Sequence, residues 1–112
     1  MIQTLISAPN LAPVNLRAHN MSSTSLLVAW EQLPEDQVNG ILLGYKVAYS
    51  KYGEIDARKQ NVSTMMSFII SGLDKFTVYQ VNVSAFTRVG NGPEAIVSAS
   101  TDQDGEENLT LA

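Results

Sequence analysis

The chain of 112 residues contains several short stretches in which apolar and polar residues alternate. The clearest begins at Tyr79, where every second residue is apolar (Tyr79, Val81, Val83 and Ala85) and the residues between them are Gln80, Asn82 and Ser84. A period of two residues indicates a strand with one face buried and the other in water. The same alternation occurs over residues 26–30 and 45–49, and at Phe68 and Ile70. The pattern therefore predicts a protein made of strands.

Turn-forming residues separate these stretches. We expect strands over residues 14–18, 26–30, 41–49, 68–70, 79–85 and 95–101, with a poorly defined strand between residues 53 and 63. The glycines at 90 and 92 are expected to supply positive φ angles in a tight loop. Seven short strands favour an all-β fold, a seven-stranded antiparallel Greek-key β-sandwich. The chain has no cysteine, so this sandwich has no disulfide.

The region around Tyr79 predicts the centre of the molecule. Leu73 lies six residues before Tyr79. This spacing is typical of a tyrosine corner, in which the ring packs in the core and its hydroxyl group bonds to backbone a few residues upstream. We predict that the strand from Tyr79 is central. The apolar positions that we expect at the centre of the core are Trp30, Tyr45, Val47, Leu73, Tyr79, Val81 and Val83.

From Pro9 to Thr101 the order of these motifs resembles a fibronectin type III domain. The matching residues are Pro13, Leu16, Trp30, Gly44-Tyr45, Val47, Tyr49, Leu73, Thr77, Tyr79, Val81, Val83, Ala85, Gly90, Gly92-Pro93 and Thr101. The chain departs from the family pattern at Lys75, where proline is common, and at Thr87, where asparagine is common. The integrin-binding Arg-Gly-Asp tripeptide is absent. The resemblance implies an immunoglobulin-like sandwich of the kind found in tandem in cell-adhesion molecules and receptors.

We expect the chain to divide into three parts. Residues 1–8 form an N-terminal tail, residues 9–101 the fibronectin type III domain, and residues 102–112 an acidic C-terminal linker. A chain of this length can bury the core of one domain without a disulfide or a metal.

Composition removes several classes of function. The net charge is −4 and no lysine or arginine cluster is present, so we expect no nucleic-acid partner. No apolar run is long enough to insert into a membrane. His19 is the only histidine, and we expect it at the surface. Without a base beside a nucleophile, we expect no enzyme, no cofactor and no metal site. The carboxylates of residues 102–107 fit a solvated linker better than a calcium loop.

The pattern Asn-x-Ser/Thr occurs at four positions. These candidate N-glycosylation sites are Asn20, Asn61, Asn82 and Asn108. Four is a modest excess over chance in a chain rich in serine and threonine. A glycosylated extracellular domain and a chance occurrence both remain open.

The leading hypothesis is a non-catalytic extracellular module of a larger adhesion or receptor protein, which acts as a spacer and a protein-binding surface. Its partners would be other proteins and the adjacent domains of the same polypeptide. Two alternatives stay open: an intracellular scaffold such as a muscle filament domain, and an accessory domain of a secreted enzyme. Glycans on the native protein would separate the first alternative from the leading hypothesis.

Two surfaces are candidates for protein binding. The first is the end formed by loops 31–40 and 88–93, with Glu35, Asp36, Arg88 and Asn91. The second is the outer face of the central strand, where Phe86 would be an exposed aromatic near Ala48. A sugar on Asn82 would cover this face, so the two features cannot easily serve one interface. We favour the loop end.

Overall fold

A computed structural model describes residues 7–54, 58–62 and 64–101. The chain forms seven strands and one short 3-10 helix. In order they are β1 (Val14–Ser22), β2 (Ser25–Glu31), η1 (Glu35–Gln37), β3 (Gly44–Lys51), β4 (Arg58–Val62), β5 (Ser67–Ile70), β6 (Val78–Phe86) and β7 (Asn91–Ser100). Within the described ranges, no helix is long and apolar enough to cross a membrane.

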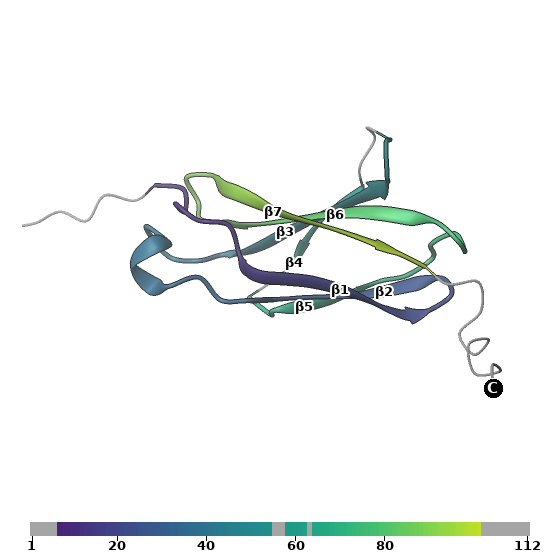
Figure 1. Cartoon of the computed structure of the whole chain (residues 1–112). Helices are drawn as coiled ribbons and strands as arrows, with labels where there is room; N and C mark the ends of the chain where they lie inside the picture. Colours follow the sequence, from purple (N-terminus) through teal and green to yellow (C-terminus); the bar gives the residue numbers. More distant parts are fainter. Residues whose placement is uncertain (1–6, 55–57, 63, 102–112) are drawn as a thin grey trace, which may run out of the picture.

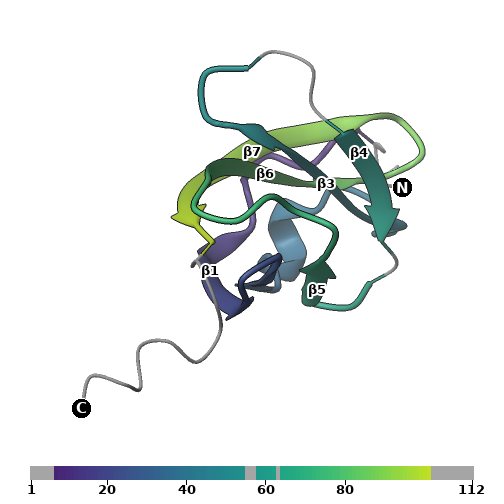
Figure 2. The ribbon, with the colours of Figure 1, turned by 90° about the vertical axis from the view of Figure 1, so that its right-hand side faces the viewer.

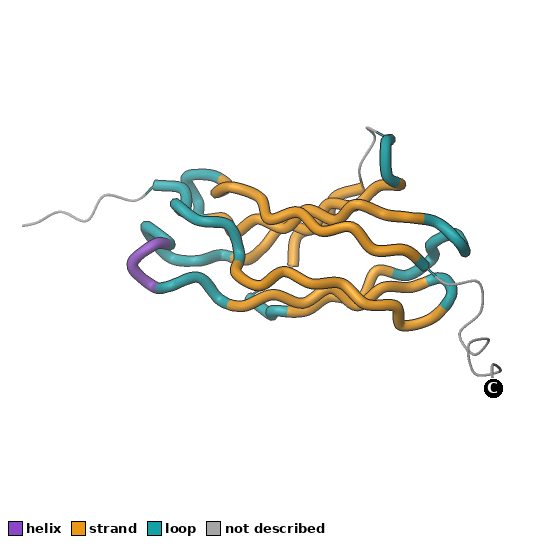
Figure 3. The backbone as a smooth tube through the Cα atoms, viewed as in Figure 1, coloured by secondary structure: helices purple, strands orange, loops and turns teal. Residues whose placement is uncertain are grey.

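The strands form two antiparallel sheets that pack face to face (Figures 1 and 2). One sheet has the order β1-β2-β5 and the other has the order β4-β3-β6-β7. Strand β6 lies between β3 and β7, which confirms that the strand from Tyr79 is central. The predicted all-β, seven-stranded sandwich is therefore confirmed. Along the tube of Figure 3, the loops gather at the two ends of the sandwich.

The core lies between the inward faces of the two sheets, as the period of two predicts. All seven residues expected at its centre are buried, and they are joined by Leu26, Val28, Leu33, Val38, Val62, Ile70 and Ala85. The rings of Trp30 and Tyr45 meet edge to face with centroids 5.2 Å apart. Aromatic contacts of this kind add to the stability that burial of the rings provides.

The predicted tyrosine corner is confirmed. The Tyr79 hydroxyl oxygen accepts a hydrogen bond of 2.9 Å from the backbone N–H of Asp74. Thr101 reinforces the same turn, because its hydroxyl group donates to the carbonyl of Asp74 over 2.6 Å. The backbone N–H of Thr101 also donates to the carbonyl of Thr77. The last described residue is thus fixed to the turn before β6.

Three strand boundaries differ from the prediction by three residues or more. The first strand continues beyond Ala18 to Ser22, because it pairs with β2 as far as a two-residue turn. Strand β3 begins at Gly44, so Ile41 lies outside it and has 78% of its surface exposed. Strand β7 begins at Asn91 rather than Ala95, because Asn91 already pairs with Phe86.

The prediction for the glycines of loop 88–93 was wrong. Among the described residues, positive φ angles occur at other glycines and not at Gly90 or Gly92. Glycine is needed at position 92 because a side chain would not fit there, and not because of its φ angle. A Cβ atom on Gly92 would lie 2.8 Å from the carbonyl oxygen of Pro9, closer than packed atoms can approach. The segment before β1 therefore passes directly over the start of β7.

Ser84 also differs from the prediction. We expected it on the solvent face of β6, but only 3% of its surface is exposed. It lies between Lys46 on β3 and Glu94 on β7, whose longer side chains flank it on this face. His19, in contrast, is exposed as predicted.

Candidate binding surfaces at the two ends of the sandwich

At the N-terminal end of the sandwich, two loops and the segment before β1 come together (Figure 1). The loops are residues 32–43, which include η1, and residues 87–90 between β6 and β7. We call residues 7–10 the N-terminal strap. The backbone N–H of Ser7 donates to the carbonyl of Asn39 over 2.9 Å. The carbonyl of Ser7 accepts from the Thr87 hydroxyl group over 2.8 Å.

The strap makes three more bonds to the loop that contains η1, one of them from the side-chain amide of Asn10 to the Gln37 Oε1 atom over 3.3 Å. The side-chain amide of Asn39 donates to the carbonyl of Ala8 over 3.0 Å, and the backbone N–H of Asn10 donates to the carbonyl of Gln37 over 2.9 Å. Asn39 has a φ angle of 65°, a left-handed conformation that asparagine tolerates better than most residues. The strap thus ties the two loops together, although residues 7 and 8 fall in the predicted tail.

An apolar depression of about 280 Å³ lies beside the strap. Its lining residues are Ile41, Leu43, Thr87 and Arg88. Ile41 and Leu43 are 78% and 48% exposed, and both line the same depression. The sequence pattern placed both residues in the strand over residues 41–49, so their position in a loop was missed. The pair Asn39-Gly40 just before them marks a turn, but its position alone does not show where the next strand begins.

The sequence predicted four binding residues for this end, and the structure describes the side chains of three of them. Asp36 is exposed in η1, and Arg88 is exposed in the facing loop. Asn91 is exposed at the first position of β7. Glu35 belongs to η1, but its side chain lies outside the described part. Arg88 thus lines the depression, and Asp36 belongs to a loop at the same end of the sandwich.

The outer face of the larger sheet presents the second candidate surface. Phe86 is half-buried, and the Lys46 ammonium group lies over its ring, 5.5 Å from the centroid. This cation–π contact already occupies one side of the ring. Asn82 is also half-buried, and its side-chain amide donates to Glu94 over 3.0 Å. Phe86 is therefore less available than the sequence suggested.

The structure describes two complete sequon asparagines. Asn20 is exposed on β1, and its side-chain amide donates to the Ser100 carbonyl over 2.6 Å. Asn82 lies on the outer face of β6, as described above. Asn61 belongs to β4, but its side chain lies outside the described part. Asn108 and the whole predicted linker also lie outside it. Occupancy of all four sites stays a prediction.

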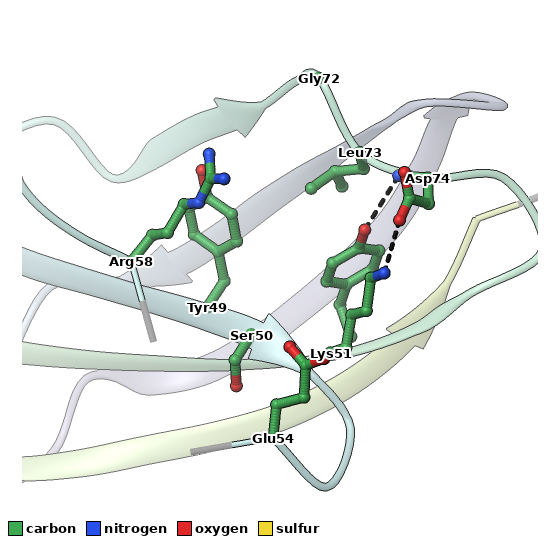
Figure 4. Close-up of a pocket in the computed structure, with 9 residues that line it drawn as sticks. Tyr49, Ser50, Lys51, Glu54, Arg58, Gly72, Leu73 and Asp74 are labelled. Carbon is green, nitrogen blue, oxygen red and sulfur yellow. Dashed lines mark hydrogen bonds and ion pairs between the residues drawn. The ribbon is translucent and has the colours of Figure 1, made fainter. Parts of the chain in front are cut away.

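At the C-terminal end, a polar groove of about 270 Å³ lies beside the tyrosine corner (Figure 4). Its lining residues are Tyr49, Ser50, Lys51, Glu54, Arg58, Gly72, Leu73, Asp74 and Tyr79. Lys51 and Asp74 form an ion pair of 2.6 Å across it. The groove has two basic and two acidic side chains, so its charges balance. It offers hydrogen bonds but no strong attraction for an ion of either sign.

Two pKa values are shifted, that of Lys51 in the groove and that of Tyr45 in the core. The hydrogen bond from Lys51 to Asp74, together with the negative charge of Asp74, raises the pKa of Lys51. Burial raises the pKa of Tyr45, and the indole N–H of Trp30 opposes this rise. Neither the Tyr45 hydroxyl group nor the Trp30 N–H has a partner with hydrogen-bond geometry among the described residues. Both groups belong to the core and not to a binding surface.

Comparison with known proteins finds a family model and relatives that match most of this chain. The family model that describes the fibronectin type III domain matches residues 11–101. Protein sidekick-1 of Gallus gallus is 39% identical over 94 residues, which cover 81% of this chain and 4% of the relative. The cell adhesion molecule DSCAM of Homo sapiens is 37% identical over 92 residues, which cover 80% of this chain and 5% of the relative. The chain thus spans only a small part of the curated relatives it matches.

A solved structure shows the same fold in a tandem arrangement. The crystal structure of the chicken CNTN1 FN1–FN3 domains superposes with a TM-score of 0.76 at 26% sequence identity. The superposition covers 85% of this chain and 33% of that chain. One of several consecutive domains in that protein therefore has the architecture described above.

Proposed function

The chain belongs to the fibronectin type III family, and on this basis we propose that it is a non-catalytic extracellular module of a larger adhesion protein or receptor. In this role it spaces the neighbouring domains and presents a protein-binding surface. Relatives that include a protein named as a cell adhesion molecule support the adhesion role. The exposed sequon at Asn20 is consistent with a glycosylated protein.

We place the protein-binding surface at the N-terminal end. The single observation that carries this choice is the depression lined by Ile41 and Leu43, next to Arg88. Large aliphatic side chains exposed together, with charged groups at their border, are typical of a docking site. The strap holds the two loops in place through five hydrogen bonds. A prearranged surface loses less conformational entropy when a partner binds.

The outer sheet face is the weaker choice. Lys46 covers one side of the Phe86 ring, and the face also presents the sequon at Asn82. A sugar on Asn82 would place a bulky, hydrated group over the neighbouring strands. A partner that needs this face would then be excluded.

The binding of a tetrameric form of the chain to cells tests the choice between the two surfaces. The purified chain is displayed as a tetramer and its binding to cells from the natural source is measured by flow cytometry. Ile41→Ser removes the apolar contact, while Asp36→Lys and Arg88→Glu reverse the two border charges. We expect Ile41→Ser to reduce binding at least about tenfold, because a central contact contributes more than about 1.4 kcal/mol. The two charge reversals should reduce binding less, chiefly by slowing association.

Phe86→Ser and Ile96→Ser are the matched controls on the outer face. Ile96 is 59% exposed, so its replacement removes a similar apolar group from a different surface. All five variants should unfold within a few degrees of the parent, since none of these side chains is in the core. Loss of binding in Phe86→Ser alone would refute the N-terminal surface.

A further inference from the structure

Asn82 lies between two apolar residues on the outer face of the larger sheet. The register places it directly opposite Ala48 on β3 and directly opposite Ile96 on β7. Directly opposed residues of antiparallel strands have Cβ atoms about 5 Å apart, so their side chains are neighbours. Ile96 is 59% exposed and Ala48 is partly buried. The asparagine of one sequon therefore has an aliphatic neighbour on each side.

Hydrogen bonds hold the side-chain amide of Asn82 at both of its ends. Its Oδ1 atom accepts from the side-chain amide of Gln80 over 3.4 Å, and its Nδ2 atom donates to Glu94 Oε1 over 3.0 Å. An asparagine Nδ2 atom has two hydrogens, and the bond to Glu94 uses one of them. Glu94 belongs to β7, as Ile96 does, so the nitrogen that would bear a sugar lies toward β7.

The sequon at Asn20 has different surroundings. Asn20 is exposed, and its side-chain amide donates to the backbone carbonyl of Ser100 over 2.6 Å. Its cross-strand partner is Leu26, which is fully buried. A sugar on Asn20 would therefore not meet an exposed aliphatic side chain directly opposite, as a sugar on Asn82 would.

We propose that Asn82 carries an N-linked oligosaccharide in the natural protein, and that its first sugar ring packs on the side chain of Ile96. The ring covers aliphatic surface that otherwise meets water, and this burial stabilises the domain. The inference rests on the proposed extracellular role, because N-linked oligosaccharides are added to secreted and cell-surface proteins. It gives the outer face of the larger sheet to a sugar and leaves the N-terminal end to a protein partner.

The attachment of the sugar precedes the folding of β6. Asn82 Nδ2 attacks the anomeric carbon of an oligosaccharide carried on a lipid diphosphate. The nitrogen–carbon bond forms, the bond from that carbon to the diphosphate oxygen breaks, and one amide proton is released. The hydroxyl group of this sequon belongs to Ser84, which is only 3% exposed in the folded chain. A transferase can reach this hydroxyl group only before β6 pairs with its neighbours.

Mass spectrometry of glycopeptides from the natural protein tests the modification. We expect an oligosaccharide on Asn82. A bare Asn82 would overturn the proposal, and an occupied Asn20 beside it would leave the extracellular role intact. The location of the module is measured separately by labelling of intact cells, so the two failures are distinguishable.

Thermal unfolding of a chain with one sequon tests the packing. Asn20, Asn61 and Asn108 are replaced by glutamine, so that only Asn82 can be modified. This chain is secreted from cultured animal cells and trimmed with an endoglycosidase that leaves the first sugar ring. The same chain made in bacteria, which lacks the sugar, is the reference. We expect the trimmed chain to melt a few degrees above the reference.

Ile96→Ser shows whether the sugar acts through this side chain. In a double-mutant cycle, the rise in melting temperature that the sugar causes should largely disappear in Ile96→Ser. Ile69→Ser is the matched control, because Ile69 is 49% exposed on β5 of the other sheet, and it should leave the rise unchanged. An equal rise with and without the Ile96 side chain would overturn the packing.

A second chain, in which only Asn20 can be modified, excludes a general effect of glycosylation. Any change in melting temperature caused by its sugar should be the same with Ile96 and with Ile96→Ser. A change that depends on Ile96 in this chain as well would contradict the proposal, because a sugar on Asn20 is not opposite that residue.

Discussion

Tyr45 and Tyr79 both pack in the core, but their hydroxyl groups have different surroundings. Tyr79 is 5% exposed and its hydroxyl oxygen accepts the Asp74 N–H. Tyr45 is fully buried, and its hydroxyl group lacks a described partner with hydrogen-bond geometry. A satisfied buried hydroxyl group stabilises a protein modestly, whereas an unsatisfied one retains its desolvation cost.

This difference predicts opposite effects for the same substitution. Tyr79→Phe should lower the free energy of unfolding by about 1 kcal/mol, and by up to about 3 if the Asp74 N–H is left unpaired. Tyr45→Phe should leave the free energy of unfolding unchanged or raise it by up to about 1 kcal/mol, because it removes an unpartnered polar group. Urea titrations followed by the fluorescence of Trp30 measure both. Equal losses in the two variants would show that the hydroxyl groups have equivalent surroundings.

Among the elements, the N-terminal strap depends on the close approach of Pro9 to Gly92. A methyl group on Gly92 would meet the Pro9 carbonyl oxygen at 2.8 Å and the Pro9 Cβ at 2.9 Å. At Gly90, in contrast, the nearest atom to an added Cβ is the Ala8 Cβ at 3.9 Å, an ordinary contact. The two glycines are two residues apart and differ in the space around them.

Gly92→Ala should therefore displace the strap and lower the free energy of unfolding by about 1–3 kcal/mol. Gly90→Ala is the matched control and should change the free energy of unfolding by less than about 1 kcal/mol. A small increase is consistent with this expectation, because alanine lowers the conformational entropy of the unfolded chain. Thermal unfolding gives the comparison, and the amide exchange rate of Ser7, whose N–H bonds to Asn39, reports on the strap itself. A stable Gly92→Ala protein with a protected Ser7 amide would contradict the tight contact.

The strands could be predicted because apolar and polar residues alternate along them. The pattern over 79–85 identified every buried residue of β6 except Ser84, which its flanking Lys46 and Glu94 shield. Alternation alone could not fix where β3 begins, because Ile41 and Leu43 continue an apolar run that the loop geometry places outside the strand. The strap was missed for a related reason. Its hydrogen bonds join segments 32 and 80 residues apart, and no local pattern encodes such contacts.

At the scale of the whole molecule, the two ends of the sandwich have different chemistry. The N-terminal end has an aliphatic depression lined in part by Arg88, and the C-terminal end has a charge-balanced polar groove beside the tyrosine corner. The two surfaces are separated by the length of the sheets (Figure 1). The sequence placed Asp36, Arg88 and Asn91 at the N-terminal end, but it placed Ile41 and Leu43 in a strand.

Cell-surface labelling of the natural protein tests the central claim, that this module lies outside the cell. A membrane-impermeant amine reagent is applied to intact cells, and labelled peptides are identified by mass spectrometry. Lys59 is exposed on β4 and provides the reporter amine. The account predicts that Lys59 is labelled on intact cells to the same extent as after permeabilisation. Labelling of Lys59 only after permeabilisation would contradict it and would favour an intracellular scaffold.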